Sequence, residues 1–157
     1  MVAVIAHALA VIRRDICGVP CDPDRCASVA LFHDSSEILT GDLPTPIKYY
    51  NPQIRDSYKQ VEHVAEDKLL RMLPRELQGD YEEVLRPSDE QVQELVKAAD
   101  KLSAHIKCLE ELKAGNGEFR AAAEQTRAAL DKMDLPELKY FCENFLGSFA
   151  LTLDEME

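Results

Sequence analysis

Apolar residues recur along this chain every three or four positions, which is the spacing of one face of a helix. The recurrence is clearest between residues 88 and 115, where Val92, Ala99, Leu102 and Ile106 belong to one long apolar stripe. No segment alternates apolar and polar residues over more than a few positions, as a half-buried strand would. The pattern therefore predicts an all-α protein.

Five further segments carry the helical spacing, and they cover much of the remaining chain. These segments are residues 1–14, 22–39, 51–74, 119–133 and 135–145. The first is apolar almost all round, which is typical of a buried helix. The stretch from Gln78 to Pro87 carries no clear period and is predicted to be irregular.

Helix starts are marked by capping residues. Residues 22–23 and 51–52 each place a capping side chain before a proline, which suits the first helical position. Ser88 and Gln91 have the spacing of a capping box before the longest helix. Residues 40–46 contain one glycine and two prolines, so they should end the helix that precedes them.

Apolar positions in residues 22–39 are expected to supply the core contacts of that helix. They are Ala27, Ala30, Leu31, Ile38 and Leu39. In residues 51–74 the helical period is carried by Ile54, Tyr58, Val61, Val64 or Ala65, Lys68 and Met72.

Length and charge narrow the functional classes. A chain of 157 residues predicts a single domain over residues 1–157. The formal net charge of −11 and the lack of Lys/Arg clusters argue against a surface that binds a nucleic acid polymer. A small phosphorylated substrate stays possible, because a bound metal ion supplies positive charge locally. The opening apolar stretch is short and has no basic region before it, so neither a membrane span nor a signal peptide is expected.

The chain contains five cysteines, an odd number with uneven spacing, which indicates free thiols in a reducing cytoplasm. Cys17, Cys21 and Cys26 lie within ten residues and raise the question of a zinc site. Their spacings do not match a CxxC knuckle, and no second pair follows. Free or buried thiols are therefore the favoured interpretation, with structural zinc as the alternative.

His33, Asp34 and Glu37 bring an imidazole and two carboxylates into an apolar helical pattern. In a single helix over residues 27–39, side chains three and four positions apart would share a face. His33 and Glu37 are four apart, and Asp34 and Glu37 are three apart. This grouping forms half of a divalent-metal site with a candidate proton acceptor.

Two more carboxylates are candidates on different grounds. Asp42 follows the predicted helix on a stiff loop, where it would either reach a bound ligand or cap the turn. Asp100 adjoins the apolar stripe of the long helix, and a carboxylate at the margin of a core usually has a partner. That partner is either Lys97, in an ion pair, or the metal ion held by His33 and Asp34.

Two other histidines are given structural interpretations. His7 lies in the apolar opening segment and is expected to be a packed helix histidine, with a metal ligand as the alternative. His63 lies among acidic residues and is expected on the surface.

The segments HDSSEILTGDLPTPIKYYN and KAADKLSAHIKCLEEL are similar, nearly residue for residue, to bacterial 5′-deoxynucleotidases of the HD-domain phosphohydrolase superfamily. The opening VAVIAHALA and the ending SFALTLDE resemble the same family, so the resemblance covers essentially the whole chain. A His-Asp pair alone would be weak evidence, whereas the longer motif around it is highly specific. The resemblance implies an HD-domain helical bundle.

The resemblance also assigns roles to residues. It implies that His33, Asp34 and Asp100 are metal ligands, that Glu37 positions or deprotonates the attacking water, and that Asp42 faces the substrate sugar. Enzymes of this family remove the 5′ phosphate from deoxyribonucleoside monophosphates, use a divalent cation such as Co or Mn, and form homodimers. Carboxylates beside a metal ion are suited to this chemistry, because the ion activates water and a carboxylate accepts its proton.

One departure from the family concerns the start of the chain. The family's first histidine ligand precedes the segment that corresponds to residues 1–3, and a tryptophan and an arginine that contact substrate lie earlier still. The sequence is therefore expected to be N-terminally truncated relative to the family. Three interpretations follow: a fragment of a normal nucleotidase, a short metal-binding enzyme with altered activity, or a catalytically impaired module that binds nucleotides or a protein. The first is favoured for function, with the activity of this exact chain open.

Overall fold

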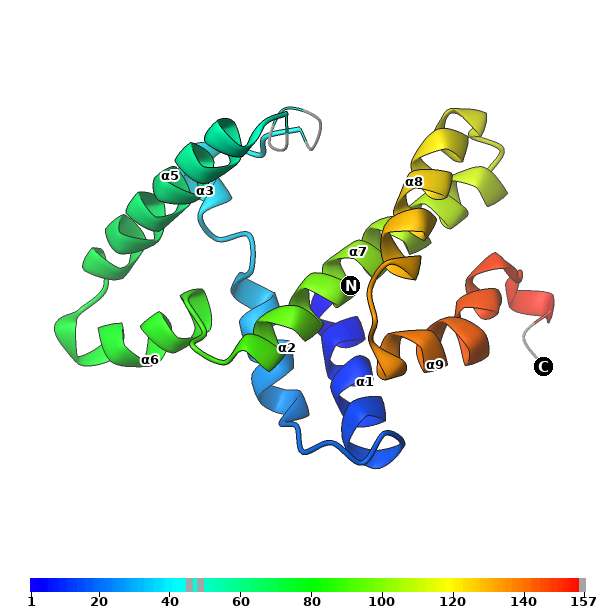
Figure 1. Ribbon diagram of the computed structural model, residues 1–157, viewed down its shortest axis with the longest axis horizontal. Helices are drawn as coiled ribbons and strands as arrows, with labels where there is room; N and C mark the ends of the chain where they lie inside the picture. Colours follow the sequence, from blue (N-terminus) through cyan, green and yellow to red (C-terminus); the bar gives the residue numbers. More distant parts are fainter. Residues whose placement is uncertain (45–46, 48–49, 156–157) are drawn as a thin grey trace. The chain divides into compact units, whose positions relative to one another are not determined.

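The computed structural model describes residues 1–44, 47 and 50–155, and within these residues the chain is helical with no strand (Figure 1). The prediction of an all-α protein is confirmed. The chain divides into two compact units. Unit 1 comprises Met1–Ala30 and Asp89–Glu157, and unit 2 comprises Leu31–Ser88. The expected single domain over residues 1–157 stays a prediction.

Unit 1 is organised around its longest helix, α7. It contains α1 (Val2–Asp15), most of α2 (Pro23–Phe32), α7 (Glu90–Lys113), α8 (Arg120–Asp131) and α9 (Pro136–Asn144), with short 3₁₀ turns η1 (Gly117–Phe119), η2 (Leu146–Ala150) and η3 (Leu153–Glu155). Helix α7 packs against α1 and α8, and α1 also packs against α9. Figure 1 shows α1 lying across α7.

The core of unit 1 follows the predicted stripe. Leu95, Leu102 and Ile106 of α7 are fully buried, and they join Leu9 of α1 in one hydrophobic cluster. The alanines at positions 6, 10, 98 and 99 are also fully buried, so the helix backbones can approach closely. The pattern of the long helix therefore predicted the centre of this unit correctly.

Unit 2 contains α3 (Glu37–Thr40), α5 (Pro52–Arg71) and α6 (Arg75–Leu85). Asn51 caps α5 as predicted, because its side chain accepts a hydrogen bond from the Ile54 amide at 2.8 Å. Arg86 holds α6 against α5 through Glu66 and Asp67, at 2.6 Å and 2.8 Å. This guanidinium also donates to the carbonyl of His63.

Several predictions about the second half of the chain need correction. Residues 78–87 were expected to be irregular, but α6 covers most of them, with Gly79 inside the helix. The long helix is capped by Asp89 rather than by the predicted box of Ser88 and Gln91, because the Asp89 carboxylate accepts hydrogen bonds from the amides of residues 91 and 92. Helix α5 ends at Arg71, before the predicted end at Pro74.

The positions that carry the helical period of residues 51–74 differ in burial. Ala65 is buried, but Val61, Val64 and Met72 are exposed, and so is Lys68. The apolar period marked a helix face correctly but did not show that the face is covered. Among the described helices, none combines the length and the apolar character that crossing a bilayer requires.

Candidate metal and phosphate site

The His33-Asp34 pair lies in a turn, and the single helix predicted over residues 22–39 is wrong. Helix α2 ends at Phe32, residues 33–36 form turns, and α3 begins at Glu37. Ile38 and Leu31, expected in the core, are 77% and 71% exposed. Leu39 is exposed as well, whereas Ala30 is buried as predicted.

Local hydrogen bonds explain why the helix stops. The Ser35 hydroxyl donates to the Phe32 carbonyl at 2.6 Å, and the Ser35 amide donates to the same oxygen at 3.0 Å. The Glu37 amide then donates to the Asp34 carbonyl at 3.0 Å. Serine and aspartate side chains offer the backbone such local partners in competition with helical bonds. The side-chain bond of Ser35 therefore favours a turn at the end of the apolar helix.

Within this turn, Nε2 of His33 lies 2.9 Å from Oδ2 of Asp34. The histidine side chain is largely shielded, while the aspartate side chain is more open to solvent. Two atoms that bind one octahedral ion at right angles, each about 2.1 Å from it, lie about 3.0 Å apart. The contact is therefore compatible with two neighbouring ligands of one cation, and imidazole with carboxylate suits several divalent metals.

Glu37 begins α3, directly after the turn. It is half-buried, and its carbonyl accepts a hydrogen bond from the Gly41 amide at 2.9 Å. Glu37 lies three residues after Asp34, and both residues belong to unit 2. A carboxylate is a group that can accept a proton from water, so Glu37 stays a candidate for that role.

Asp42 is exposed and follows Gly41, whose φ of +71° suits a residue without a side chain. Tyr58 of α5 fixes this loop, because its hydroxyl donates to the Gly41 carbonyl at 3.0 Å. The same hydroxyl lies 3.4 Å from the Thr40 hydroxyl. Asp42 therefore extends from a loop that α5 holds in place. Residues 45, 46, 48 and 49 of the same predicted loop region lie outside the described residues.

Asp100 lies on α7 in unit 1, whereas the other four predicted site residues lie in unit 2. Its neighbour Ala99 is fully buried, but Asp100 itself is exposed. The carboxylate was expected at the margin of the core, and the exposure of Asp100 corrects that expectation. Its role as a third metal ligand stays a prediction.

The remaining candidate ligands behave differently from the predicted pair. His7 was expected to be packed, but its side chain is about half exposed and its Nε2 lies 3.7 Å from Oδ1 of Asp24. His63 is on the surface as expected, with Nδ1 3.1 Å from Glu66. Among the described residues, no group of three or more His, Cys, Asp or Glu side chains is arranged to hold a metal ion. The described cysteines, including Cys17, Cys21 and Cys26, are free thiols.

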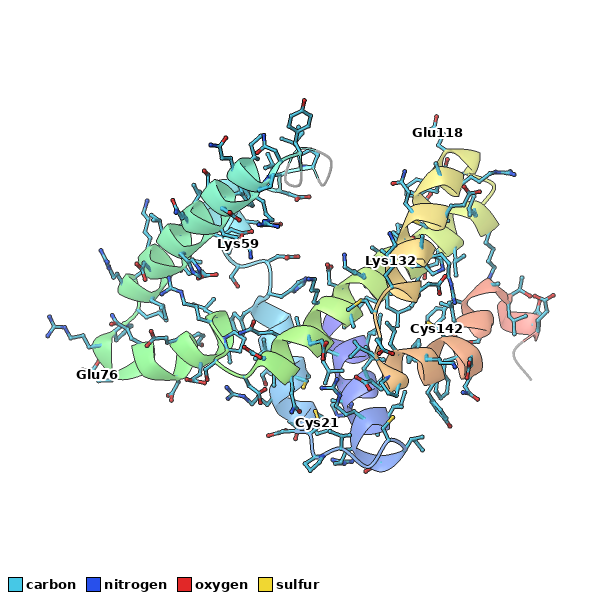
Figure 2. The ribbon with its side chains drawn as sticks, in the orientation of Figure 1. Cys21, Lys59, Glu76, Glu118, Lys132 and Cys142 are labelled. Carbon is cyan, nitrogen blue, oxygen red and sulfur yellow. The ribbon has the colours of Figure 1, made fainter. Side chains whose placement is uncertain are left out.

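Two cavities are lined entirely by described residues of a single unit, and neither lining includes a predicted site residue. A cavity of about 580 Å³ lies where α8 meets α9, and Figure 2 labels Lys132 and Cys142 on these segments. Two cations beside it are paired, Arg127 with Asp131 at 2.8 Å and Lys139 with Glu143 at 3.9 Å. A second cavity of about 460 Å³ lies along α5 and is lined by Gln53, Ile54, Ser57, Tyr58 and Val61.

Sequence reasoning missed the supporting role of Tyr58 and the burial of Ser36. Tyr58 was interpreted only as one position of the helical period in α5, and that period gave no sign of a hydrogen bond to residue 41. Ser36 is buried at the start of α3, where a serine was not expected to be hidden. A tyrosine inside an otherwise aliphatic stripe was the available signal, since a partly buried phenol usually has a polar partner.

Comparison with known proteins gives a consistent result. Residues 1–149 match the family described as 5′-deoxynucleotidase YfbR-like. A 5′-deoxynucleotidase of Vibrio parahaemolyticus is 50% identical over 157 residues, which cover 99% of this chain and 81% of the relative. A 5′-deoxynucleotidase of Pectobacterium atrosepticum is 48% identical over 157 residues, which cover 99% of this chain and 79% of the relative.

A solved structure has a similar fold. It is the crystal structure of an HD-domain phosphohydrolase from Listeria innocua, which superimposes with a TM-score of 0.78 at 24% sequence identity. The similarity covers 94% of this chain and 72% of that chain. The predicted HD-domain helical fold is thereby confirmed.

Proposed function

Because this chain belongs to the YfbR-like 5′-deoxynucleotidase family, we propose that it hydrolyses deoxyribonucleoside 5′-monophosphates to deoxynucleoside and phosphate. The observation that carries the proposal is the agreement between the family match over residues 1–149 and the His33-Asp34 contact of 2.9 Å. The match indicates the reaction class, and the contact supports the proposal that the reaction takes place at this turn. The enzyme is a nucleotide phosphomonoesterase in this proposal.

A divalent cation is part of the proposed site. HD-domain phosphohydrolases generally depend on a metal ion, and the spacing of His33 and Asp34 fits two of its ligands. We assign Asp100 as a further ligand delivered by α7. Imidazole and carboxylate ligands together suit Co or Mn. When bound, the ion would lower the pKa of water and neutralise charge on the phosphoryl oxygens.

The protein's own residues carry the other roles. Glu37 orients the attacking water and accepts its proton as the new bond to phosphorus forms. The bond between phosphorus and the 5′ oxygen then breaks, and that oxygen takes a proton to become the hydroxyl of the nucleoside. Asp42 contacts the sugar from the loop that Tyr58 holds, so substrate position depends on the hydrogen bond to Gly41.

The proposal is tested by measuring phosphate release from dCMP and dUMP and from the matching ribonucleotides. The chain is first freed of metal and then supplied with Mn²⁺ or Co²⁺. We expect release that requires added metal and is faster with the deoxyribonucleotides.

Nucleotide binding measured by calorimetry gives the necessary second readout. Binding without release at any metal concentration would contradict hydrolysis and favour a nucleotide-binding module instead. Release that persists with excess chelator would contradict the role of the metal ion, even if the substrate were confirmed.

We also propose a homodimer in the cytoplasm. Exposed apolar side chains in unit 2, among them Ile38, Val61 and Val64, support a role for this unit in self-association. The free cysteines are compatible with a reducing compartment. Light scattering coupled to size-exclusion chromatography tests the dimer, since a monomer mass at micromolar concentration would contradict it.

A further inference from the structure

Two thiols meet at the start of α2, and nothing in the proposed phosphatase reaction uses them. Sγ of Cys21 lies 3.8 Å from Sγ of Cys26. Figure 2 labels Cys21 on the connection between α1 and α2. Both residues belong to unit 1, so the contact is defined within a single compact body.

The local fold explains why these two sulfurs touch. The Asp22 carboxylate accepts a hydrogen bond from the Arg25 amide at 3.1 Å, and the Asp22 carbonyl accepts one from the Cys26 amide at 3.1 Å. Asp22 is thus the N-cap of α2, with Pro23 as the first helical residue. Cys21 precedes the cap and Cys26 is the fourth residue of the helix, the two positions that pack together in a hydrophobic staple.

We propose that Cys21 and Cys26 form a reversible disulfide when the protein meets a peroxide. A staple keeps its two side chains in contact for as long as the helix is capped, so the two sulfurs are already neighbours when oxidation begins. The sulfurs need to approach from 3.8 Å to a bond length of about 2.0 Å for the disulfide to form.

The two thiols differ in access, which sets the order of the reaction. Cys21 is half-buried and reachable, whereas Cys26 is fully buried. Burial raises the pKa of Cys26 to about 12, so this thiol is protected from direct oxidation. Its contact with Cys21 also raises the pKa.

The chemistry balances with peroxide as the oxidant. The Cys21 sulfur attacks one peroxide oxygen, the O–O bond breaks, and Cys21 becomes a sulfenic acid while water leaves. The Cys26 sulfur then attacks the Cys21 sulfur, the S–O bond breaks, and a second water carries away the Cys26 proton. A dithiol such as dithiothreitol reverses the process by thiol–disulfide exchange.

The sequence provides a direct assay, because Arg25 separates the two cysteines. Trypsin cleaves after Arg14, Arg25 and Lys48, so residues 15–25 and 26–48 become separate peptides. The full chain is treated with hydrogen peroxide, blocked with N-ethylmaleimide, digested and analysed without reduction. We expect the two peptides to be joined after peroxide and separate after dithiothreitol, while the number of free thiols falls from five to three.

Matched variants identify the bonded cysteine, because residues 15–25 contain both Cys17 and Cys21. Cys17→Ser and Cys142→Ser should retain the joined peptides. Cys21→Ser and Cys21→Ala should lose them, with Cys26 labelled only after unfolding. Unjoined wild-type peptides with Cys21 oxidised to sulfinic acid would overturn the proposal, and so would joined peptides that persist without Cys21. Circular dichroism of each variant verifies that helices are retained.

Discussion

At the scale of single residues, two opposite charges are buried together in unit 1. Arg13 of α1 is 7% exposed and Glu137 of α9 is 1% exposed. Nε of Arg13 donates to Oε1 of Glu137 at 2.9 Å, and Nη2 lies 2.6 Å from the same oxygen. Glu94 of α7 adds a weaker contact at 3.4 Å. This pair joins the first helix of the chain to one near its end.

Breaking this pair should destabilise the protein more than replacing both partners. Glu137→Leu leaves the Arg13 charge without its buried partner, so we expect the free energy of unfolding to fall by about 3 to 5 kcal/mol. The double variant Arg13→Met with Glu137→Leu should recover a large part of that loss. Urea denaturation measures both, and a double variant no more stable than the single one would contradict the expectation.

The proposed roles of Asp34 and Glu37 separate binding from turnover. Asp34→Asn should weaken Mn²⁺ binding by about tenfold or more. Loss of a residue that only hydrogen-bonds to a metal ligand already lowers metal affinity by about this factor. Glu37→Gln should leave Mn²⁺ affinity unchanged and lower kcat by about 10² to 10⁴. Calorimetry measures the first and phosphate release the second.

Exposed carboxylates on α6 serve as controls for these variants. Asp80→Asn and Glu76→Gln change charge equally in unit 2 without touching the proposed site, so both should behave as the wild type. Unchanged metal affinity in Asp34→Asn would reject its role as a ligand. Retained turnover in Glu37→Gln would reject its role as a base.

At the scale of helices, the contact between α7 and α8 contains a buried histidine. Nδ1 of His105 lies 2.9 Å from the Thr126 hydroxyl, which itself donates to the Ala122 carbonyl at 2.8 Å. The direction of the first bond depends on which ring nitrogen of His105 carries the proton. Burial lowers the pKa of His105, and the nearby Arg127 lowers it further.

This histidine should make stability depend on pH. Since the folded-state pKa lies below the unfolded value of about 6.5, the unfolded chain binds more protons in mildly acidic solution. The free energy of unfolding should therefore fall as the pH drops below about 6.5, by no more than about 1.4 kcal/mol per pH unit for one proton. Urea denaturation at about pH 7.5 and 5.5 measures the change. An equal loss in His105→Gln would show that another group is responsible.

The boundaries of the helices were harder to predict than their existence. The long helix α7 was predicted from its apolar period, since it carries buried residues from Val92 to Cys108. The same period failed at residues 33–36, where serine and aspartate hydrogen bonds interrupt an apolar stretch. Helix α6 was missed because it contains Gly79 and many polar residues, which obscure the apolar period. Its contact with α5 depends on Arg86, which follows the helix.

Long-range contacts within the site and the core were beyond sequence reasoning alone. The candidate residues His33, Asp34 and Glu37 were selected from their types and from their spacing in one helix, and the turn at residues 33–36 removes the shared helix face that this spacing assumed. The hydrogen bond from Tyr58 to Gly41 and the pairing of Arg13 with Glu137 join residues 17 and 124 positions apart. Neither pair produces a repeating pattern in the sequence, because a contact between two distant residues does not recur along the chain.

At the scale of the whole chain, unit 1 is built from two segments that are far apart in sequence. Residues 1–30 provide α1, residues 89–157 provide α7, α8 and α9, and unit 2 is inserted between them. Helices α1 and α7 must therefore find each other across an intervening stretch before the core forms. The free-energy cost of closing such a loop grows only with the logarithm of its length, so the inserted unit adds little to the cost of folding unit 1.

Because unit 1 is built from two segments, we expect it to fold even when the backbone is broken within unit 2. A break at residues 72–74, between α5 and α6, would leave α1 on one piece and α7 on the other, with the fully buried Leu9 and Leu102 on opposite sides of the break. Two separately synthesised halves should consequently reassemble when mixed and migrate as one species on size-exclusion chromatography. Halves that elute apart in native buffer would contradict this, whereas dissociation in urea would be the normal result.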